Sequence, residues 1–312
     1  MKYIYILKEK KMKNGYFDSP LDYAALMRHV DALSESYPSI ELSHIGNSLL
    51  SRRIPMLHIG ERYGREVLFV AGHHASEWLC TGVLLSFAEE LCRQAREGGR
   101  LWGYSVEYLC RTRRITIIPQ LNVDGTDIAI NGISPDCPLY DRLKRASPDG
   151  DFSRWQANAR GVDLNHNYNA RFYEYKQLEA EAGIYGASPT RYSGEYPESE
   201  PECAALANYL RCTTPALVIS LHSQGEVIYG SESGARDARE IGQRLSAACG
   251  YPLATPDGMA AYGGLSDWYC AEFGLPAFTF ECGIGENPLP LSEGEGIYSR
   301  IRRALFSALY LV

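Results

Sequence analysis

The chain has 312 residues, of which 45% are hydrophobic, and its formal net charge is −7 at pH 7. A chain of this length can bury a substantial core in one domain. Its acidic balance and its lack of a basic stripe argue against a nucleic-acid partner, and no apolar run approaches the roughly 18 residues that a membrane-spanning helix requires.

The cysteines and the N-terminus bear on the compartment in which the protein works. Nine cysteines are an odd number, and no two of them form a Cys-x-x-Cys pair, so we predict neither a disulfide framework nor a cysteine zinc site. Residues 1–7 form too short an apolar run for a secretory signal, and the lysines that follow lie on the wrong side of it. We therefore expect reduced cysteines and a cytoplasmic location.

Strand-like and helix-like patterns alternate along the chain, with no internal repeat or low-complexity linker to divide it. Short apolar runs predict strands at residues 54–59, 67–71, 114–121, 216–221 and 277–281. Helical patterns predict helices at residues 21–36, 77–96, 200–210, 235–248, 266–273 and 296–311. The alternation is typical of an α/β fold, namely a single-domain mixed, mostly parallel central sheet flanked by helices on both faces.

The domain organisation follows from the same patterns. We expect an N-terminal tail at residues 1–15 and one domain at residues 16–312. Residues 131–199 are rich in Gly, Pro, Asn, Tyr and charge. We predict that they form loops that shape a binding site rather than a second domain.

Polar residues follow three of the predicted strands, where ligands collect in sheets of this kind. His74 and Glu77 come after the strand that ends at residue 71, and a His and a carboxylate at this spacing can bind one ion as the chain turns into a helix. His222 ends another apolar run, where a histidine without a partner would be costly. These three residues are candidate ligands of one metal ion.

Glu281 ends the last predicted strand, and a carboxylate there is costly unless it faces a cation or a solvent-filled cleft. Three protein ligands with one open position are typical of catalytic zinc, and a nearby carboxylate can then take a proton from water. Asp163 is a candidate acceptor that would orient His74 through its other ring nitrogen. Two His and one Glu suit zinc best, although cobalt or manganese would also bind such a set.

Five segments together resemble the zinc metallocarboxypeptidase family, whose pattern is Gly-x-His-x-x-Glu-Trp, Asn-x-Asp-Gly, Gly-Val-Asp-x-Asn-Arg-Asn, Ser-x-His-Ser and a closing Phe-Glu. The matching segments occur in the family's order at residues 72–78, 122–125, 161–167, 220–223 and 280–281. The resemblance covers about residues 20 to 310 and identifies residues 16–312 as a zinc carboxypeptidase-like catalytic domain. It implies that His74, Glu77 and His222 bind one zinc ion and that Glu281 is the general base.

Within that family the chain is similar to bacterial γ-D-glutamyl-meso-diaminopimelate peptidases. Four stretches carry this likeness, at residues 155–165, 192–194 with 199–202, 222–229 and 285–290. It implies a muropeptide substrate and hydrolysis of the bond between γ-D-glutamate and meso-diaminopimelate in peptidoglycan stem peptides.

Two departures from the wider family's pattern bear on the substrate. The pair that clamps the terminal carboxylate of a substrate in the family, Asn-Arg, reads Asn165-His166 here, and a neutral His is a poorer bidentate partner than Arg. The position that carries an arginine to polarise the scissile carbonyl in many relatives is Gln156, which Arg154 and Arg160 flank. Either a neighbouring guanidinium group turns toward the scissile carbonyl, or the metal and an amide donor stabilise the developing oxyanion.

Two further residues are candidates for the substrate pocket by the same resemblance. Tyr262 falls in the loop where the family carries a tyrosine that covers the substrate, although an ordinary loop tyrosine is an equal alternative. Ser266 is expected near the floor of the pocket for the residue after the cleaved bond. A small polar floor leaves room for a long zwitterionic side chain such as that of diaminopimelate.

Other functions remain open at this point. The enzyme alternatives are a carboxypeptidase that releases C-terminal amino acids and an acyl-amino-acid deacylase. A metal-dead module that binds cell-wall peptides is the alternative from another class, and it requires the loss of a ligand or of the base. Cys282 beside Glu281 is interpreted as a buried structural cysteine rather than a nucleophile.

Overall fold

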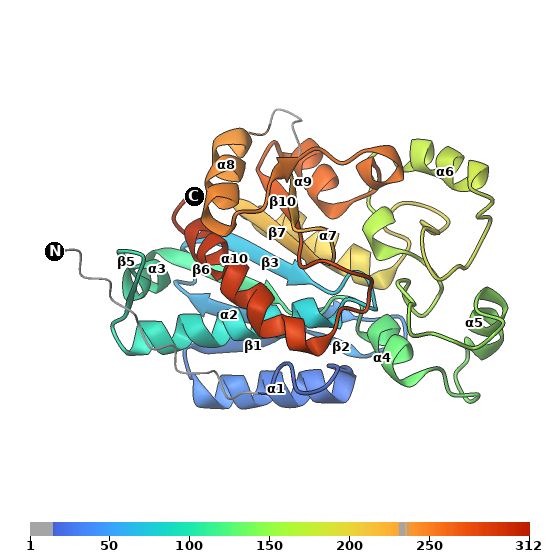
Figure 1. Cartoon of the computed structure of the whole chain (residues 1–312), viewed down its shortest axis with the longest axis horizontal. Coiled ribbons are helices and arrows are strands. Elements are labelled where there is room, and N and C mark those ends of the chain that lie inside the picture. Colours follow the sequence, from blue (N-terminus) through green and yellow to red (C-terminus); the bar gives the residue numbers. More distant parts are fainter. Residues whose placement is uncertain (1–14, 231–234, 236) are drawn as a thin grey trace.

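The computed structural model describes residues 15–230, 235 and 237–312. The expected N-terminal tail, residues 1–15, therefore lies outside the described residues except for Gly15. In the described part, eight strands form one sheet in the order β1-β2-β6-β3-β7-β10-β8-β9 (Figure 1). These strands are β1 (Ile40–Asn47), β2 (Arg53–Gly60), β3 (Arg65–Ala71), β6 (Arg113–Ile118), β7 (Leu217–His222), β8 (Val227–Gly230), β9 (Leu253–Ala254) and β10 (Ala277–Glu281).

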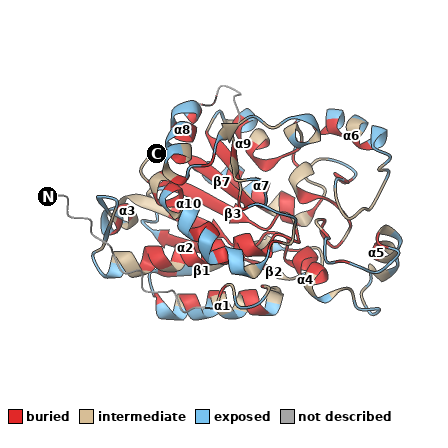
Figure 2. Ribbon diagram, viewed as in Figure 1, coloured by how far each residue is buried: buried red, intermediate tan, exposed pale blue. Residues whose placement is uncertain are grey.

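The centre of the sheet is parallel and deeply buried. Strands β6, β3, β7 and β10 pair with one another in parallel, whereas β1, β2 and β8 join the sheet through antiparallel pairs. All of β7 and all but the first residue of β3 are buried (Figure 2). Their near-continuous apolar sequences are typical of strands that are covered on both faces. The predicted mixed, mostly parallel sheet flanked by helices is therefore confirmed.

Helices cover both faces of the sheet. On one face α10 packs against both α2 and α8, while α9 packs against β7 and β10 and α7 against β1 (Figure 1). The longer helices are α1 (Tyr23–Ser36), α2 (Trp78–Arg96), α4 (Val123–Asn131), α6 (Phe172–Glu181), α7 (Pro201–Thr213), α8 (Ala238–Cys249), α9 (Leu265–Phe273) and α10 (Gly294–Ala308). Shorter elements are α3 (Val106–Thr112), α5 (Tyr140–Ala146) and the two-stranded ribbon of β4 (Arg100–Leu101) and β5 (Tyr104–Ser105).

The structure differs from the sequence-based expectation at several elements. The strand expected at residues 114–121 ends at Ile118, because the following Pro119 has no backbone N–H to donate to a ladder. Residues 131–199 contain two helices, α5 and α6, in addition to loops. These helices are short and have weak apolar periodicity, so no helical pattern stands out in the sequence.

Among the described residues, no helix combines the length and the apolar character needed to cross a membrane. The nine cysteines form no disulfide bond, and six of them are buried.

Candidate metal centre and active site

The candidate ligands come together because two neighbouring strands, β3 and β7, end at the same edge of the sheet. Gly72 follows β3 with φ of +69°, a conformation that favours glycine, and a Cβ at this position would lie 3.0 Å from Cγ of Gln120. The sharp turn brings His74 and Glu77 over the end of β3, and α2 begins directly after Glu77. His222 is the last residue of the neighbouring strand β7.

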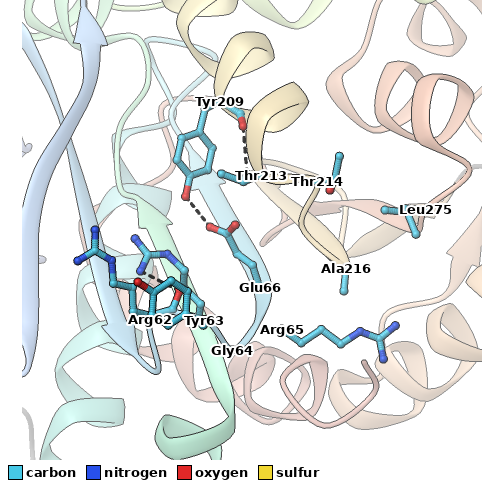
Figure 3. A pocket seen from close by; sticks show the side chains of 11 residues that line it. Arg62, Tyr63, Gly64, Arg65, Glu66, Tyr209, Thr213, Thr214, Ala216 and Leu275 are labelled. Atoms are coloured by element: carbon cyan, nitrogen blue, oxygen red, sulfur yellow. Dashed lines mark hydrogen bonds between the residues drawn. The ribbon is translucent and has the colours of Figure 1, made fainter.

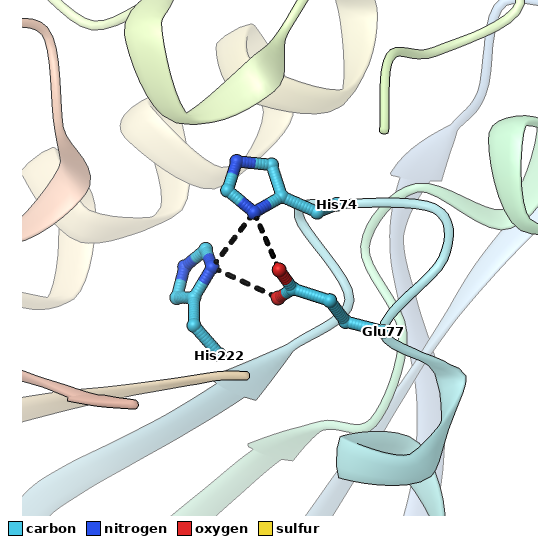
Figure 4. A group of neighbouring side chains, drawn as sticks. All are labelled: His74, Glu77 and His222. Atoms are coloured by element: carbon cyan, nitrogen blue, oxygen red, sulfur yellow. Dashed lines mark hydrogen bonds and ion pairs between the residues drawn. The ribbon is translucent and has the colours of Figure 1, made fainter. Parts of the chain in front are cut away.

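The two rings and the carboxylate point toward one another (Figure 4). Nδ1 of His74 lies 2.9 Å from Oε1 of Glu77, Nδ1 of His222 lies 3.1 Å from Oε2 of Glu77, and the two Nδ1 atoms are 3.2 Å apart. Ligand atoms that surround a tetrahedral zinc ion at about 2.0–2.1 Å are about 3.3 Å from one another. The spacing of the three groups therefore fits one zinc ion.

Asp163 determines which nitrogen of His74 is available to the ion. Oδ1 of Asp163 lies 3.2 Å from Nε2 of His74. Although burial favours the neutral acid, the nearby His74 and His166 lower the pKa of Asp163, so it is a carboxylate that can only accept. Nε2 of His74 therefore carries the proton and Nδ1 presents its lone pair to the cluster.

The protonation of the cluster also fits a cation. Burial opposes the charged forms, but the carboxylates of Glu77 and Asp163 raise the pKa of His74 well above its usual value. In the same way, His74 and His222 overcome burial and lower the pKa of Glu77 to about 2. The buried carboxylates thus favour positive charge between the three groups, where a metal ion would bind. No second group of three or more possible ligands is found among the described residues.

Glu281 lies beside the cluster and is not tied to it. It is the last residue of β10, directly opposite His222 in the parallel pair of β10 and β7. Its side chain makes no hydrogen bond or ion pair with a described residue. Burial raises the pKa of Glu281 to about 7; the carboxylate of Glu77 adds to this rise, whereas the two histidines oppose it. A partly exposed carboxylate with this pKa can both accept and donate a proton near neutral pH.

Asn287 supports Glu77, and sequence reasoning missed it. Its Nδ2 donates to Oε1 of Glu77 at 3.1 Å and to the carbonyl of Ser223 at 2.5 Å, while the Ser223 hydroxyl donates to Oδ1 of Asn287 at 2.8 Å. The backbone N–H of Ser223 donates to Oε2 of Glu77. Asn287 lies within residues 285–290, but nothing in that stretch indicates a contact with a residue 210 positions earlier.

The three candidates for polarising a carbonyl occupy different environments. Gln156 is tied to the metal-binding turn, because its backbone carbonyl accepts from the N–H of Ala75 at 3.0 Å. Its side-chain oxygen accepts from Thr190, so the side-chain N–H₂ remains available. Arg154 instead forms an exposed ion pair with Glu286, and Arg160 lies 3.5 Å from the buried carboxylate of Glu200. Both guanidinium groups thus have acidic partners.

His166 is held between the Tyr262 loop and α6. Nδ1 of His166 donates to the backbone carbonyl of Tyr262 at 2.8 Å, and its ring stacks on Tyr175 at 4.2 Å between centroids. Burial lowers the pKa of His166 despite the nearby Asp163. Its remaining nitrogen, Nε2, is therefore an acceptor and cannot clamp a carboxylate. The guanidinium of Arg171, which the sequence did not single out, lies over the Tyr262 ring at 4.2 Å.

The remaining two candidates lie at the start of α9. Oδ1 of Asn165 accepts from the backbone N–H of Leu265 at 3.4 Å. The Ser266 hydroxyl lies 2.9 Å from that of Thr279. Thr279 is two residues before Glu281 on β10, so both side chains point to the same face of the strand. Ser266 thus lies on the face of the sheet from which Glu281 projects.

A cluster of two His and one Glu with zinc spacing, placed at the carboxyl edge of this sheet, defines a zinc metallopeptidase fold and site. In agreement, residues 26–295 match the zinc carboxypeptidase family, and the chain belongs to that family. The predictions of the family, of a peptidase and of one zinc ion are confirmed.

The chain is also similar to individual proteins and to solved structures. The chain is 31% identical over 294 residues to gamma-D-glutamyl-L-diamino acid endopeptidase 1 of Lysinibacillus sphaericus, covering 93% of this chain and 72% of that protein. It is also 31% identical over 157 residues to murein peptide amidase A of Escherichia coli (strain K12), covering 49% and 62%. Among solved structures, thrombin-activatable fibrinolysis inhibitor superposes with a TM-score of 0.73 at 23% identity, over 95% of this chain and 75% of that one.

Proposed function

We propose that this zinc peptidase hydrolyses the bond between γ-D-glutamate and meso-diaminopimelate in peptidoglycan stem peptides. The reaction type rests on one observation: Glu281 is the one carboxylate at the cluster that has no partner among the described residues, beside three groups that match one zinc ion. The substrate rests on the similarity to the endopeptidase of Lysinibacillus sphaericus. The residues of the chain have the following roles in this proposal.

His74, Glu77 and His222 hold the zinc ion, and Asp163 and Asn287 fix the orientation of His74 and Glu77. When bound, zinc lowers the pKa of water and polarises a carbonyl as a Lewis acid. The Glu281 carboxylate takes the proton of the attacking water and afterwards delivers it to the leaving nitrogen of diaminopimelate. Its pKa of about 7 suits both transfers, because the carboxylate and the acid are then close in free energy.

The substrate contacts follow from the environments of the remaining residues. The free N–H₂ of Gln156 donates to the developing oxyanion, since Arg154 and Arg160 are paired with carboxylates. Asn165, His166, Tyr262 and Ser266 form the pocket for the diaminopimelate residue. Because His166 offers a lone pair at Nε2, it favours an ammonium group over the terminal carboxylate that a carboxypeptidase clamps. The extent of the catalytic domain, residues 16–312, and a cytoplasmic location stay predictions of the sequence.

The decisive experiment is mass spectrometry of L-Ala-γ-D-Glu-meso-diaminopimelate incubated with the zinc-loaded protein and with the Glu281→Gln variant. We expect the wild type to produce L-Ala-D-Glu and diaminopimelate. The variant should be slower by roughly 10²–10⁴-fold, the usual contribution of a general base. Zinc content is measured for both proteins as a control, because Glu281 is not a proposed ligand.

Two results would contradict the proposal in different ways. Release of C-terminal amino acids from ordinary peptides, with no cleavage of the muropeptide, would make the protein a carboxypeptidase and leave the zinc site intact. Full activity in Glu281→Gln would remove Glu281 from the role of general base whatever the substrate.

A further inference from the structure

A cavity of about 600 Å³ opens at the amino ends of the central strands, at the opposite edge of the sheet from the metal centre (Figure 3). Arg65 begins β3, and Ala71 ends it beside the metal-binding turn. At about 3.3 Å per residue, the two sites are therefore about 20 Å apart. The residues that line the cavity include Arg62, Arg65, Glu66, Arg114 and Tyr209.

The cavity contains a buried carboxylate without a cation. Glu66 is only 7% exposed, and its Oε1 accepts from the hydroxyl of Tyr209 at 2.6 Å and from that of Thr116. Neither hydrogen bond uses Oε2, and no described Lys, Arg or His forms an ion pair with Glu66. In Figure 3 the carboxylate lies at the middle of the cavity wall, with one oxygen directed to Tyr209 and the other away from it. A buried carboxylate is costly unless a cation or further donors meet it.

The residues behind Glu66 cannot neutralise it. Thr116 donates its hydroxyl proton to Glu66, so it accepts from Nδ1–H of His58 at 3.0 Å. Burial, assisted by Arg114, lowers the pKa of His58 to about 4, which keeps the imidazole neutral at pH 7. Burial likewise raises the pKa of Tyr209 to about 12, so its hydroxyl stays a donor. The network orients the carboxylate but brings no positive charge to it.

Three guanidinium groups line the same cavity. Arg62 and Arg65 are exposed, Arg114 is half-buried, and none of them forms an ion pair with a described carboxylate. Arg114 donates to the backbone carbonyl of Arg62 at 3.5 Å, and the guanidinium of Arg62 lies over the Tyr63 ring at 6.0 Å. Glu66 is the one acidic residue in the lining. The cavity thus presents donors suited to carboxylates around one acceptor suited to an ammonium group.

We propose that this cavity is a binding site for an acidic α-amino acid. The ammonium group of the ligand pairs with Oε2 of Glu66, and its carboxylates pair with the guanidinium groups of Arg62, Arg65 and Arg114. Three positive groups against one negative group favour a ligand with more carboxylates than ammonium groups, as in glutamate. The site is separate from the peptidase centre and does not depend on the substrate proposed there.

The test is isothermal titration calorimetry of the zinc-loaded full chain with glutamate and two truncated analogues. Glutarate lacks the ammonium group, and 4-aminobutyrate lacks one carboxylate. We expect glutamate to bind at least about tenfold more tightly than either analogue, because each analogue lacks one charge-assisted contact. Glutarate binding as tightly as glutamate would overturn the role of Glu66.

Variants test whether glutamate binds in this cavity or at the metal centre. Arg65→Ala changes an exposed rim residue and should weaken glutamate binding about tenfold with the peptidase activity unchanged. The control Arg28→Ala, an exposed arginine on α1, should bind glutamate normally. Glu66→Gln keeps an oxygen for Tyr209 and Thr116 and should reduce glutamate affinity to that of glutarate. Absence of binding by the wild type, or unchanged binding by Arg65→Ala, would refute the proposal.

Discussion

Charged side chains are arranged differently at the two edges of the sheet. They contact one another at the carboxyl edge, whereas those at the amino edge line a cavity without forming ion pairs. At the carboxyl edge, the rings of His74 and His222 both face the carboxylate of Glu77, and Asn287 and Asp163 hold this arrangement from behind. At the amino edge, Glu66 and three arginines line one cavity without an ion pair among them. Groups that nearly touch suit a single small ion, whereas groups separated by a cavity suit a molecule that carries both signs of charge.

The largest expected effect comes from removing one of the proposed zinc ligands at the carboxyl edge of the sheet. His222→Ala should lose stoichiometric zinc and at least about 10³-fold of peptidase activity, because metal assistance is worth several kcal/mol. Zinc is measured by atomic emission on protein dialysed without chelator. Glutamate binding at the amino edge serves as the control and should not change. A variant that keeps both zinc and activity would exclude His222 as a ligand.

Gln156→Ala tests whether the Gln156 side chain stabilises the negative charge that develops on the oxygen of the scissile carbonyl. If its N–H₂ stabilises the oxyanion, kcat should fall by about 10²–10³-fold, with little change in bound zinc. The matched variants are Arg154→Ala and Arg160→Ala, whose guanidinium groups pair with Glu286 and Glu200. We expect both to change kcat by less than about threefold. A larger loss in Arg160→Ala than in Gln156→Ala would assign the oxyanion contact to the arginine.

Asn287→Ala measures how much the hydrogen bond from Asn287 to Glu77 contributes to zinc affinity. Loss of the hydrogen bond to Oε1 should weaken zinc binding by about 10–100-fold, the usual effect of removing a partner of a metal ligand. Competition with a chromophoric chelator gives the affinity. Ser223→Ala, which removes only the hydroxyl bond to Asn287, should have a smaller effect. Equal zinc affinity in Asn287→Ala and the wild type would show that the backbone of Ser223 suffices to hold Glu77.

The pH dependence of zinc binding tests the proton that the metal-free cluster holds. The pKa of His74 is raised, so the metal-free site keeps a proton at pH 7 that zinc must displace. Zinc affinity should therefore rise about tenfold per pH unit between pH 6 and 8 and level off only above the pKa of His74. Chelator competition across this range, in buffers that do not bind zinc, measures the slope. A flat profile would mean that His74 is already unprotonated at Nδ1 without metal.

The sequence by itself determined the centre of the sheet and the candidate metal ligands. The strands β3, β7 and β10 are short runs of mostly apolar residues. Their burial on both faces of the sheet can be inferred from their residue types alone. His74 and Glu77 are three residues apart, so their ability to share an ion is a local property of the chain. The matching motifs then identified the family, because their order along the chain leaves little room for coincidence.

Only the tertiary structure decided the partners of these residues. Asn287 reaches Glu77 across 210 positions, and Arg154 reaches Glu286 across 132. The charged cavity at the amino edge joins the start of β3 to the helix α7, which lies more than a hundred residues later. Hydrogen bonds and ion pairs of this kind depend on which loops the packed core brings together. A side chain's neighbours across the fold leave no periodic pattern in the sequence.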